Sequence, residues 1–203
     1  MTKSLPDRRR SLCASLAALL IAALPSMVLA QTTFDLGALM QLLGTIKAGE
    51  ATFTESRRVE MLERSLQSSG TLSFESPDRF VRETLKPRQE RIAVVGDVVT
   101  LSSGSRSRTV TLDSMPEAAV IFEAIRGTLT GNRDAIERNF TTTVTGDAAR
   151  WTLELAPRTA RLRELVVSIR VSGAQALVRE VAVRMSDGDR SVMSITPTSS
   201  TPR

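Results

Sequence analysis

Hydrophobic residues recur at helical spacing in two stretches of the chain. The first stretch covers residues 33–46, and its apolar positions are Leu36, Leu39, Met40, Leu43 and Ile46. The second covers residues 116–130 with Pro116 in its first turn, and its apolar positions are Ala118, Ile121, Phe122, Ile125 and Leu129. Spacings of three and four residues predict amphipathic helices in both places. Residues 134–139 add a further expected helical turn.

Elsewhere apolar and polar residues alternate with a period of two, which predicts β-strands. Turn sequences such as Ser76-Pro77-Asp78 and Gly96-Asp97 separate the alternating segments, so successive strands should run antiparallel. We expect about ten strands. The alternating segments that supply them cover residues 48–55, 66–75, 80–85, 90–95, 98–101, 108–112, 140–145, 151–155, 165–171, 177–185 and 191–195.

A curved antiparallel sheet of this size must close, split into two layers or cover one face with helices. The helices over residues 33–46 and 116–130 are available as covers. The predicted fold class is therefore α+β, an open and incomplete antiparallel β-barrel with two or three helices covering its mouth.

The first thirty residues have the pattern of a cleavable export signal. Arg8-Arg9-Arg10 precedes an apolar run from Leu12 to Leu24, and Val28-Leu29-Ala30 offers a cleavage site. The run is shorter than the roughly 20 residues that span a bilayer. Arg9-Arg10 also resembles a twin-arginine signal, so the export route is left open. We predict a soluble protein of the Gram-negative periplasm, with one domain over residues 31–195 and a flexible tail over residues 196–203.

Composition removes several functional classes. Residues 1–30 hold four of the 27 basic and one of the 22 acidic side chains, so the mature chain keeps 23 and 21 and a formal charge of +2. This near balance argues against a nucleic-acid partner. The sequence has no His and no Tyr, and its one cysteine, Cys13, lies in the predicted signal. Histidine triads and thiolate chemistry are thereby excluded, and we expect neither an enzyme nor a cofactor or metal. Asp187-Gly188-Asp189 is interpreted as a turn rather than a calcium loop.

Several segments, in order along the chain, resemble the periplasmic LolA-like lipoprotein-carrier family. They are Ala51–Glu55, Gly70–Phe74, Ser76–Phe80, Pro87, Gly96-Asp97, Leu129–Arg133, Trp151–Pro157 and Asp187–Ser191. The resemblance implies an incomplete antiparallel barrel that shelters acyl chains of a lipoprotein or other lipid in an apolar cavity. It further implies a monomeric carrier with an inner-membrane donor and an outer-membrane acceptor.

On this resemblance, apolar residues of early strands, the second helix and a later strand should line the cavity. They are Phe53, Leu72, Phe74, Phe80, Ile121, Phe122, Ile125, Trp151, Leu153 and Leu155. In better-known carriers an Arg directly before the Pro of the second-to-third strand turn latches the helical lid. Ser76 holds that position here, and Arg79 is the candidate substitute.

Two alternatives stay open at the level of the sequence. The same apolar residues would also form an ordinary filled core, because protein interiors are close-packed. The chain would otherwise be a non-enzymatic interaction or sensor module that binds a peptide or a membrane-protein domain on its open sheet. Arg158, Arg161 and Arg163, placed in a helical turn, are the candidate cationic contact of that module.

Overall fold

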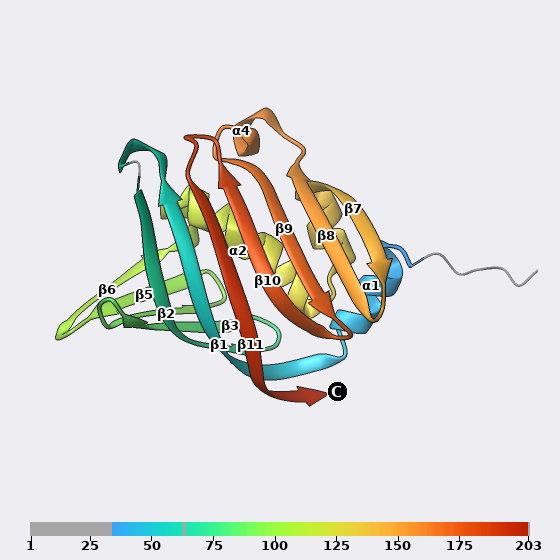
Figure 1. The fold of residues 1–203 in the computed structure, drawn as a ribbon, viewed down its shortest axis with the longest axis horizontal. Coiled ribbons are helices and arrows are strands. Elements are labelled where there is room, and N and C mark those ends of the chain that lie inside the picture. The colour runs from blue at the N-terminus through green and yellow to red at the C-terminus, as the bar shows by residue number, and fades with distance from the viewer. Residues whose placement is uncertain (1–33, 63, 203) are drawn as a thin grey trace, which may run out of the picture. The chain divides into compact units, whose positions relative to one another are not determined.

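A computed structural model describes residues 34–62 and 64–202, and the predicted export signal lies outside these residues. The strands of the described part form a single sheet in the order β6-β5-β4-β3-β2-β1-β11-β10-β9-β8-β7, with each neighbouring pair antiparallel. The end strands β6 and β7 do not pair with each other, so the sheet is open (Figure 1). The predicted class, an open antiparallel sheet with covering helices, is confirmed.

The strands are β1 (Ile46–Val59), β2 (Arg64–Glu75), β3 (Arg79–Lys86), β4 (Glu90–Val95), β5 (Val98–Ser103), β6 (Arg106–Thr111), β7 (Phe140–Asp147), β8 (Arg150–Pro157), β9 (Val166–Ala174), β10 (Leu177–Met185) and β11 (Arg190–Pro202). The helices are α1 (Leu36–Leu43), α2 (Pro116–Thr130), α3 (Arg133–Asn139) and α4 (Ala160–Arg163), with short 3₁₀ turns η1 (Glu60–Leu62) and η2 (Leu112–Ser114). Among the described residues none of these helices has the length and apolar character needed to cross a bilayer.

Local chemistry sets the helix ends. The Asp35 carboxylate accepts a hydrogen bond from the backbone N–H of Ala38 at 2.9 Å and so caps the start of α1. Helix α2 begins with Pro116 in its first turn and ends at Gly131, whose φ of 66° is the left-handed conformation that favours glycine. A Cβ at Gly131 would lie 2.3 Å from the carbonyl oxygen of Met40. The end of α2 is therefore in close contact with the end of α1.

Helix α2 crosses one face of the sheet, which we call the inner face (Figure 1). Two stripes of the helix face different neighbours. Val120, Ala124 and Thr128 are buried in the main hydrophobic core. Ile121 and Ile125, one position further along, border an open space described below. One helix thus serves two regions of the interior.

The main core is solidly packed, and we call it the filled core. It joins α1, α2 and α3 to the inner faces of β8, β9 and β10. Its largest fully buried side chains include Leu39, Leu43, Ile136, Trp151, Leu153, Leu155 and Ile169. The indole N–H of Trp151 donates to the carbonyl oxygen of Gln175 at 2.8 Å, so its polar atom is satisfied. A smaller cluster of Val94, Val99 and Leu112 lies beneath the start of α2.

The C-terminal residues differ from the prediction of a flexible tail over residues 196–203. Strand β11 continues to Pro202 and pairs with β1 from Ile46↔Pro202 to Arg58↔Arg190. Its pairing with β10 ends at Glu180↔Ser194, so beyond that point β11 has one free edge. Pro197 lies where the β1–β11 register shifts, and an edge or a bulge is where a strand tolerates the missing proline N–H. The Ser, Thr and Pro residues of this segment are not typical of a strand, so the sequence did not predict the extension of β11.

Candidate functional site

A cavity of about 550 Å³ lies between the inner face of the sheet and helix α2. We call it the sheet–helix cavity. The strand residues that border it come from β1 to β5, β10 and β11, and its helical side includes Ile121, Phe122, Ile125 and Leu129 of α2. Most of the lining is apolar. Its volume is in the range of proteins' small-molecule sites, roughly 300–1,000 Å³.

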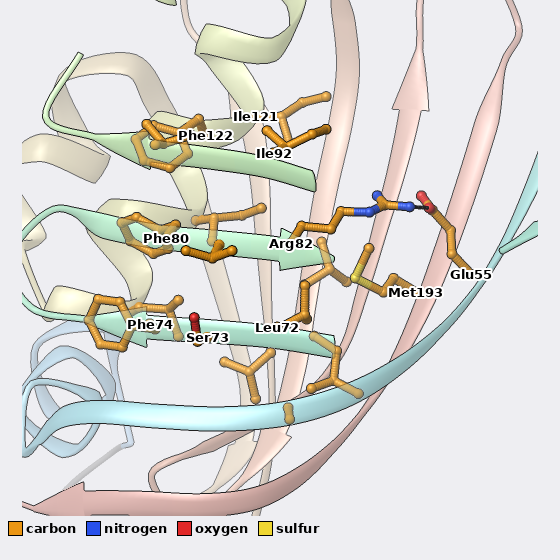
Figure 2. A pocket seen from close by; sticks show the side chains of 18 of the residues that line it. Glu55, Leu72, Ser73, Phe74, Phe80, Arg82, Ile92, Ile121, Phe122 and Met193 are labelled. Carbon is orange, nitrogen blue, oxygen red and sulfur yellow. Dashed lines mark hydrogen bonds and ion pairs between the residues drawn. The ribbon is translucent and has the colours of Figure 1, made fainter. Parts of the chain in front are cut away.

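Three phenylalanines close one side of the cavity. The rings of Phe74 and Phe80 have centroids 5.0 Å apart, and Phe80 meets Phe122 of α2 edge-to-face at 4.8 Å. Figure 2 shows Phe74, Phe80 and Phe122 in a row along this side of the cavity. The edge-to-face contact stabilises this arrangement in addition to the burial of apolar surface. These rings hold α2 against the early strands and leave the aliphatic part of the cavity beside them.

A partly buried ion pair projects into the same cavity from the opposite side (Figure 2). Nη2 of Arg82 lies 2.6 Å from Oε2 of Glu55, and the two side chains are 29% and 14% exposed. The hydroxyl of Ser191 donates to Oε1 of Glu55, and the hydroxyl of Ser68 donates to Oε2 at 3.2 Å. Nη2 of Arg82 is also 3.2 Å from the Ser68 oxygen. The pair is therefore embedded in a polar network contributed by four strands.

Opposing effects act on the pKa of Glu55. Burial raises the pKa, while the Ser191 hydrogen bond, the Arg82 charge and the hydrogen bonds from Arg82 and Ser68 lower it. The lowering effects prevail, so the pKa of Glu55 is below its usual value and the carboxyl is ionised at neutral pH. The cavity therefore contains a salt bridge in its charged form.

A second ion pair joins β1 to the turn between β10 and β11. Nη2 of Arg57 is 2.8 Å from Oδ2 of the buried Asp189, and the backbone N–H of Glu60 donates to Oδ1 at 3.0 Å. The Arg57 hydrogen bond and the Glu60 N–H lower the pKa of Asp189. The backbone N–H of Asp189 donates to Oδ1 of Asp187, which fits the predicted turn. No cluster of metal-ligating side chains occurs within residues 34–62 and 64–202.

Six of the ten predicted lining residues border the cavity, and four do not. The six are Leu72, Phe74, Phe80, Ile121, Phe122 and Ile125. Trp151, Leu153 and Leu155 instead belong to the filled core at 0–1% exposure. Phe53 lies on the inner face of β1, but the Arg82 guanidinium covers its ring at 4.6 Å from the centroid. The placement of these four in the cavity is corrected, because helix or arginine side chains fill the space over them.

The predicted latch residues make their contacts within the sheet. Nε of Arg79 lies 3.6 Å from Glu75 at the end of the adjoining strand, and the backbone N–H of Ser76 donates to the carbonyl oxygen of Lys47 at 2.7 Å. Among the described residues, neither side chain forms an ion pair or hydrogen bond to α2. The helix instead reaches the β4–β5 turn through Arg126, whose Nη1 lies 3.6 Å from Asp97. Arg79 therefore pairs with Glu75 and does not hold α2 as the predicted latch would.

Sequence reasoning missed the lining from the last two strands and the ion pair. Val181 and Val183 of β10 and Met193 and Ile195 of β11 border the cavity. The sequence shows the alternation of apolar residues in both strands, but it does not show which strands pair with them. Arg82 follows Phe80 by two residues and therefore shares its inner face. A charged residue at an inward position was the available signal for a polar group inside the cavity.

The proposed cationic contact of the alternative function is largely occupied by backbone groups. Nε of Arg158 donates to the carbonyl oxygen of Phe140 at 2.9 Å, and Nη1 of Arg163 donates to that of Arg158 at 2.8 Å. Arg161 and Arg163 lie in α4, which Thr159 caps, so the predicted helical turn is present. Arg158 and Arg163 thus make hydrogen bonds that stabilise the β8–β9 connection.

An open antiparallel sheet with an apolar cavity beneath a helix is the architecture of a protein that can enclose a hydrophobic ligand. The family model described as "Outer membrane lipoprotein carrier protein LolA-like" matches residues 29–198. The chain belongs to this LolA-like family, as the sequence segments had indicated. No curated protein sequence matches the chain.

Three solved structures are distantly similar. A LolA superfamily protein from Nitrosomonas europaea is 8% identical with a TM-score of 0.41, over 82% of this chain and 92% of that chain. The lipoprotein LppX from Mycobacterium tuberculosis is 8% identical with a TM-score of 0.43, over 79% and 93%. The MucA/MucB complex from Pseudomonas aeruginosa gives 12% identity and a TM-score of 0.45, over 83% and 59%. At these values the similarities support no functional statement.

Proposed function

We propose that the protein is a periplasmic carrier that shelters acyl chains of a lipoprotein or other lipid in the sheet–helix cavity. It would receive them from an inner-membrane donor, act as a monomer and pass them to an outer-membrane acceptor. The observation that carries the proposal is the cavity itself, about 550 Å³ of space with a mainly apolar lining. The membership of the chain in the LolA-like family also supports acyl chains as the cargo. No catalytic residue or cofactor is needed.

The dimensions of the cavity suit a hydrocarbon chain. Its lining on β1 runs from Ile46 to Arg57, roughly 36 Å of strand at about 3.3 Å per residue. One leaflet of a bilayer has a hydrocarbon depth of about 15 Å, half of the usual core thickness. Hiding a dozen methylenes from water contributes about 10 kcal/mol before the costs of ordering the ligand and moving α2. Retention with later release is therefore energetically reasonable.

A titration with a fluorescent fatty-acyl probe tests the proposal. Leu72 borders the cavity on β2, whereas Leu85 on β3 is exposed and lies outside it, so Leu72→Trp and Leu85→Trp make a matched pair. We expect saturable uptake by the wild type and by Leu85→Trp, and at least tenfold weaker uptake by Leu72→Trp, because the indole occupies the space of the chain. Folded wild-type protein that takes up no probe would exclude the carrier function.

The alternative, a module that binds a peptide or membrane-protein domain on its open sheet, has weaker support. Its candidate contact residues Arg158 and Arg163 donate to backbone carbonyls near their own connection. Replacing Arg158, Arg161 and Arg163 by Glu should therefore lower stability without affecting acyl-probe binding. Loss of capture of a partner protein by a variant that remains folded would favour the alternative.

A further inference from the structure

Arg82 presents part of its guanidinium to the cavity without a protein partner. Its Nη2 donates to Glu55 and Ser68, and its Nε lies 3.4 Å from the hydroxyl of Thr84. No hydrogen bond formed among the described residues uses Nη1 of Arg82. Figure 2 shows this remaining nitrogen pointing away from Glu55. Two N–H donors are therefore left for an acceptor that enters a mainly apolar space.

The position of this donor is fixed by its surroundings. One face of the guanidinium lies over the ring of Phe53, at 4.6 Å from the centroid, and the Glu55 salt bridge holds its edge. Cation–π contact and a short salt bridge together restrict the side chain. Apolar side chains adjoin the ion pair, since Met193 is the register partner of Glu55 on β11 and Leu72 is that of Arg82 on β2. An acceptor at Nη1 would thus have hydrocarbon contacts nearby.

Glu55 determines which acceptors are tolerated. Its carboxylate lies 2.6 Å from Nη2 and already compensates the charge of the guanidinium. An anionic ligand at Nη1 would lie a few ångströms from this carboxylate, and like charges repel strongly at that range in a partly buried site. A neutral carbonyl oxygen accepts the same hydrogen bonds without the repulsion.

We propose that Arg82 donates to the carbonyl oxygen of an ester- or amide-linked acyl chain, and that Glu55 makes the cavity discriminate against free fatty acids. This inference rests on the proposed carrier function and names the chemical class of its cargo. Arg82 would contact the ligand directly, and Glu55 would act through charge. The acyl tail would then extend over Leu72 and Met193.

Displacement of the fluorescent acyl probe by palmitic acid and by its glycerol monoester, each below its micellar concentration at neutral pH, tests the inference. Glu55→Gln keeps the shape of the side chain and one of its two acceptor oxygens, and it removes the charge. Glu83→Gln is the matched control, because Glu83 pairs with Arg91 at 2.9 Å on the same sheet but is exposed and outside the cavity. Circular dichroism and thermal unfolding establish that each variant is folded.

We expect the wild type to bind the monoester at least about tenfold more tightly than the acid. Because an apolar cavity disfavours any carboxylate by desolvation, the decisive result is the change caused by Glu55→Gln. That variant should strengthen binding of the acid by about tenfold and leave the monoester within about threefold. Glu83→Gln should behave as the wild type.

Equal binding of acid and ester by the wild type would overturn the inference. So would a Glu55→Gln variant that shows the same acid-to-ester ratio as Glu83→Gln. Both results would leave the carrier function standing, because they require that acyl ligands displace the probe. Absence of any probe uptake by the folded wild type would instead contradict the carrier function itself. If Glu55→Gln does not fold, Glu55→Ala is compared with Glu83→Ala in the same way, and equal acid-to-ester ratios for these two variants would overturn the inference.

Discussion

The filled core and the sheet–helix cavity lie on the same face of one sheet, yet one is solid and the other is hollow. In the filled core, Trp151, Leu153 and Leu155 of β8 are 0–1% exposed and pack beneath α1, α2 and α3. In the cavity, Leu72 and Phe74 of β2 share similar alternation but face about 550 Å³ of space. The difference arises from the covering helices rather than from the strands.

Helix coverage explains this contrast. Three helices converge on the inner face of β8 and β9, and Gly127 of α2 allows the approach of Ile136 from α3, where a Cβ would lie 2.8 Å from the Ile136 side chain. Over β1, β2, β3 and β11 the helical side of the cavity comes from α2. Its side chains Ile121 and Ile125 border the remaining space without filling it. Strands with the same alternation of apolar and polar residues can therefore border either a hollow or a filled region.

The largest expected contrast comes from truncating one leucine in each region. Leu153→Ala should destabilise the protein by about 2–5 kcal/mol, because it opens a new void in packed surroundings. Leu72→Ala should cost less than about 1.5 kcal/mol, since its side chain already borders empty space. Urea unfolding followed by circular dichroism measures both. Equal losses would show that the cavity wall is as tightly packed as the core.

Two glycines allow a similar comparison of a packed and an open position in the backbone. Gly131 and Gly104 both have positive φ, at 66° and 59°. A Cβ at Gly131 would also meet the Met40 carbonyl, whereas a Cβ at Gly104 has no atom within 4 Å. Gly104→Ala should cost about 1 kcal/mol from backbone strain, and Gly131→Ala about 2–3 kcal/mol. Thermal unfolding of the two variants provides the measurement, and a larger loss for Gly104→Ala would contradict the close α1–α2 contact.

Acid should weaken the cavity wall through Glu55. The pKa of Glu55 is lowered in the folded state, so its stabilising contribution is complete above the ordinary value of 4.5 and is lost as pH falls through the folded pKa. Glu55→Gln should cost about 1 kcal/mol at pH 7, and its difference from the wild type should shrink below pH 4.5. Asp189, whose pKa is also lowered, contributes acid sensitivity to both proteins. Denaturation curves at several pH values test this, and a constant difference would refute it.

The smallest expected effect is on the outer face of the filled region. Glu154 and Arg170 form a cross-strand pair at 2.7 Å, but their side chains are 52% and 59% exposed. Glu154→Gln should change stability by less than about 0.5 kcal/mol, since solvent screens exposed pairs. Urea unfolding at low and moderate salt measures the effect. A loss of stability equal to that of Glu55→Gln would show that the partly buried pair contributes no more than the exposed one.

Sequence patterns predicted most elements of the fold because local chemistry determines them. Helix α2 occupies the expected residues 116–130, since Pro116 and Gly131 mark its ends. The extension of β1 through Arg57 and Arg58 and of β11 to Pro202 was missed, because pairing between distant segments overrides local composition there.

The candidate site was predicted in part. Alternation identified Leu72, Phe74 and Phe80 as inward residues, and these line the cavity. It also selected Trp151 and Leu153, because a period of two gives the face of a strand but not the depth of the side chains opposite it. The Glu55–Arg82 pair depends on β1 and β3 flanking β2, a tertiary relation that no local motif records.

A crystal structure with an acyl ester brominated at the end of its chain would test the central claim most directly. Anomalous scattering locates the bromine without reference to weak hydrocarbon density. The account predicts a bromine peak inside the sheet–helix cavity, between the strand residue Leu72 and the helix residue Ile121. A bromine peak on the outer face of the sheet, or an empty cavity at saturating ligand, would contradict it.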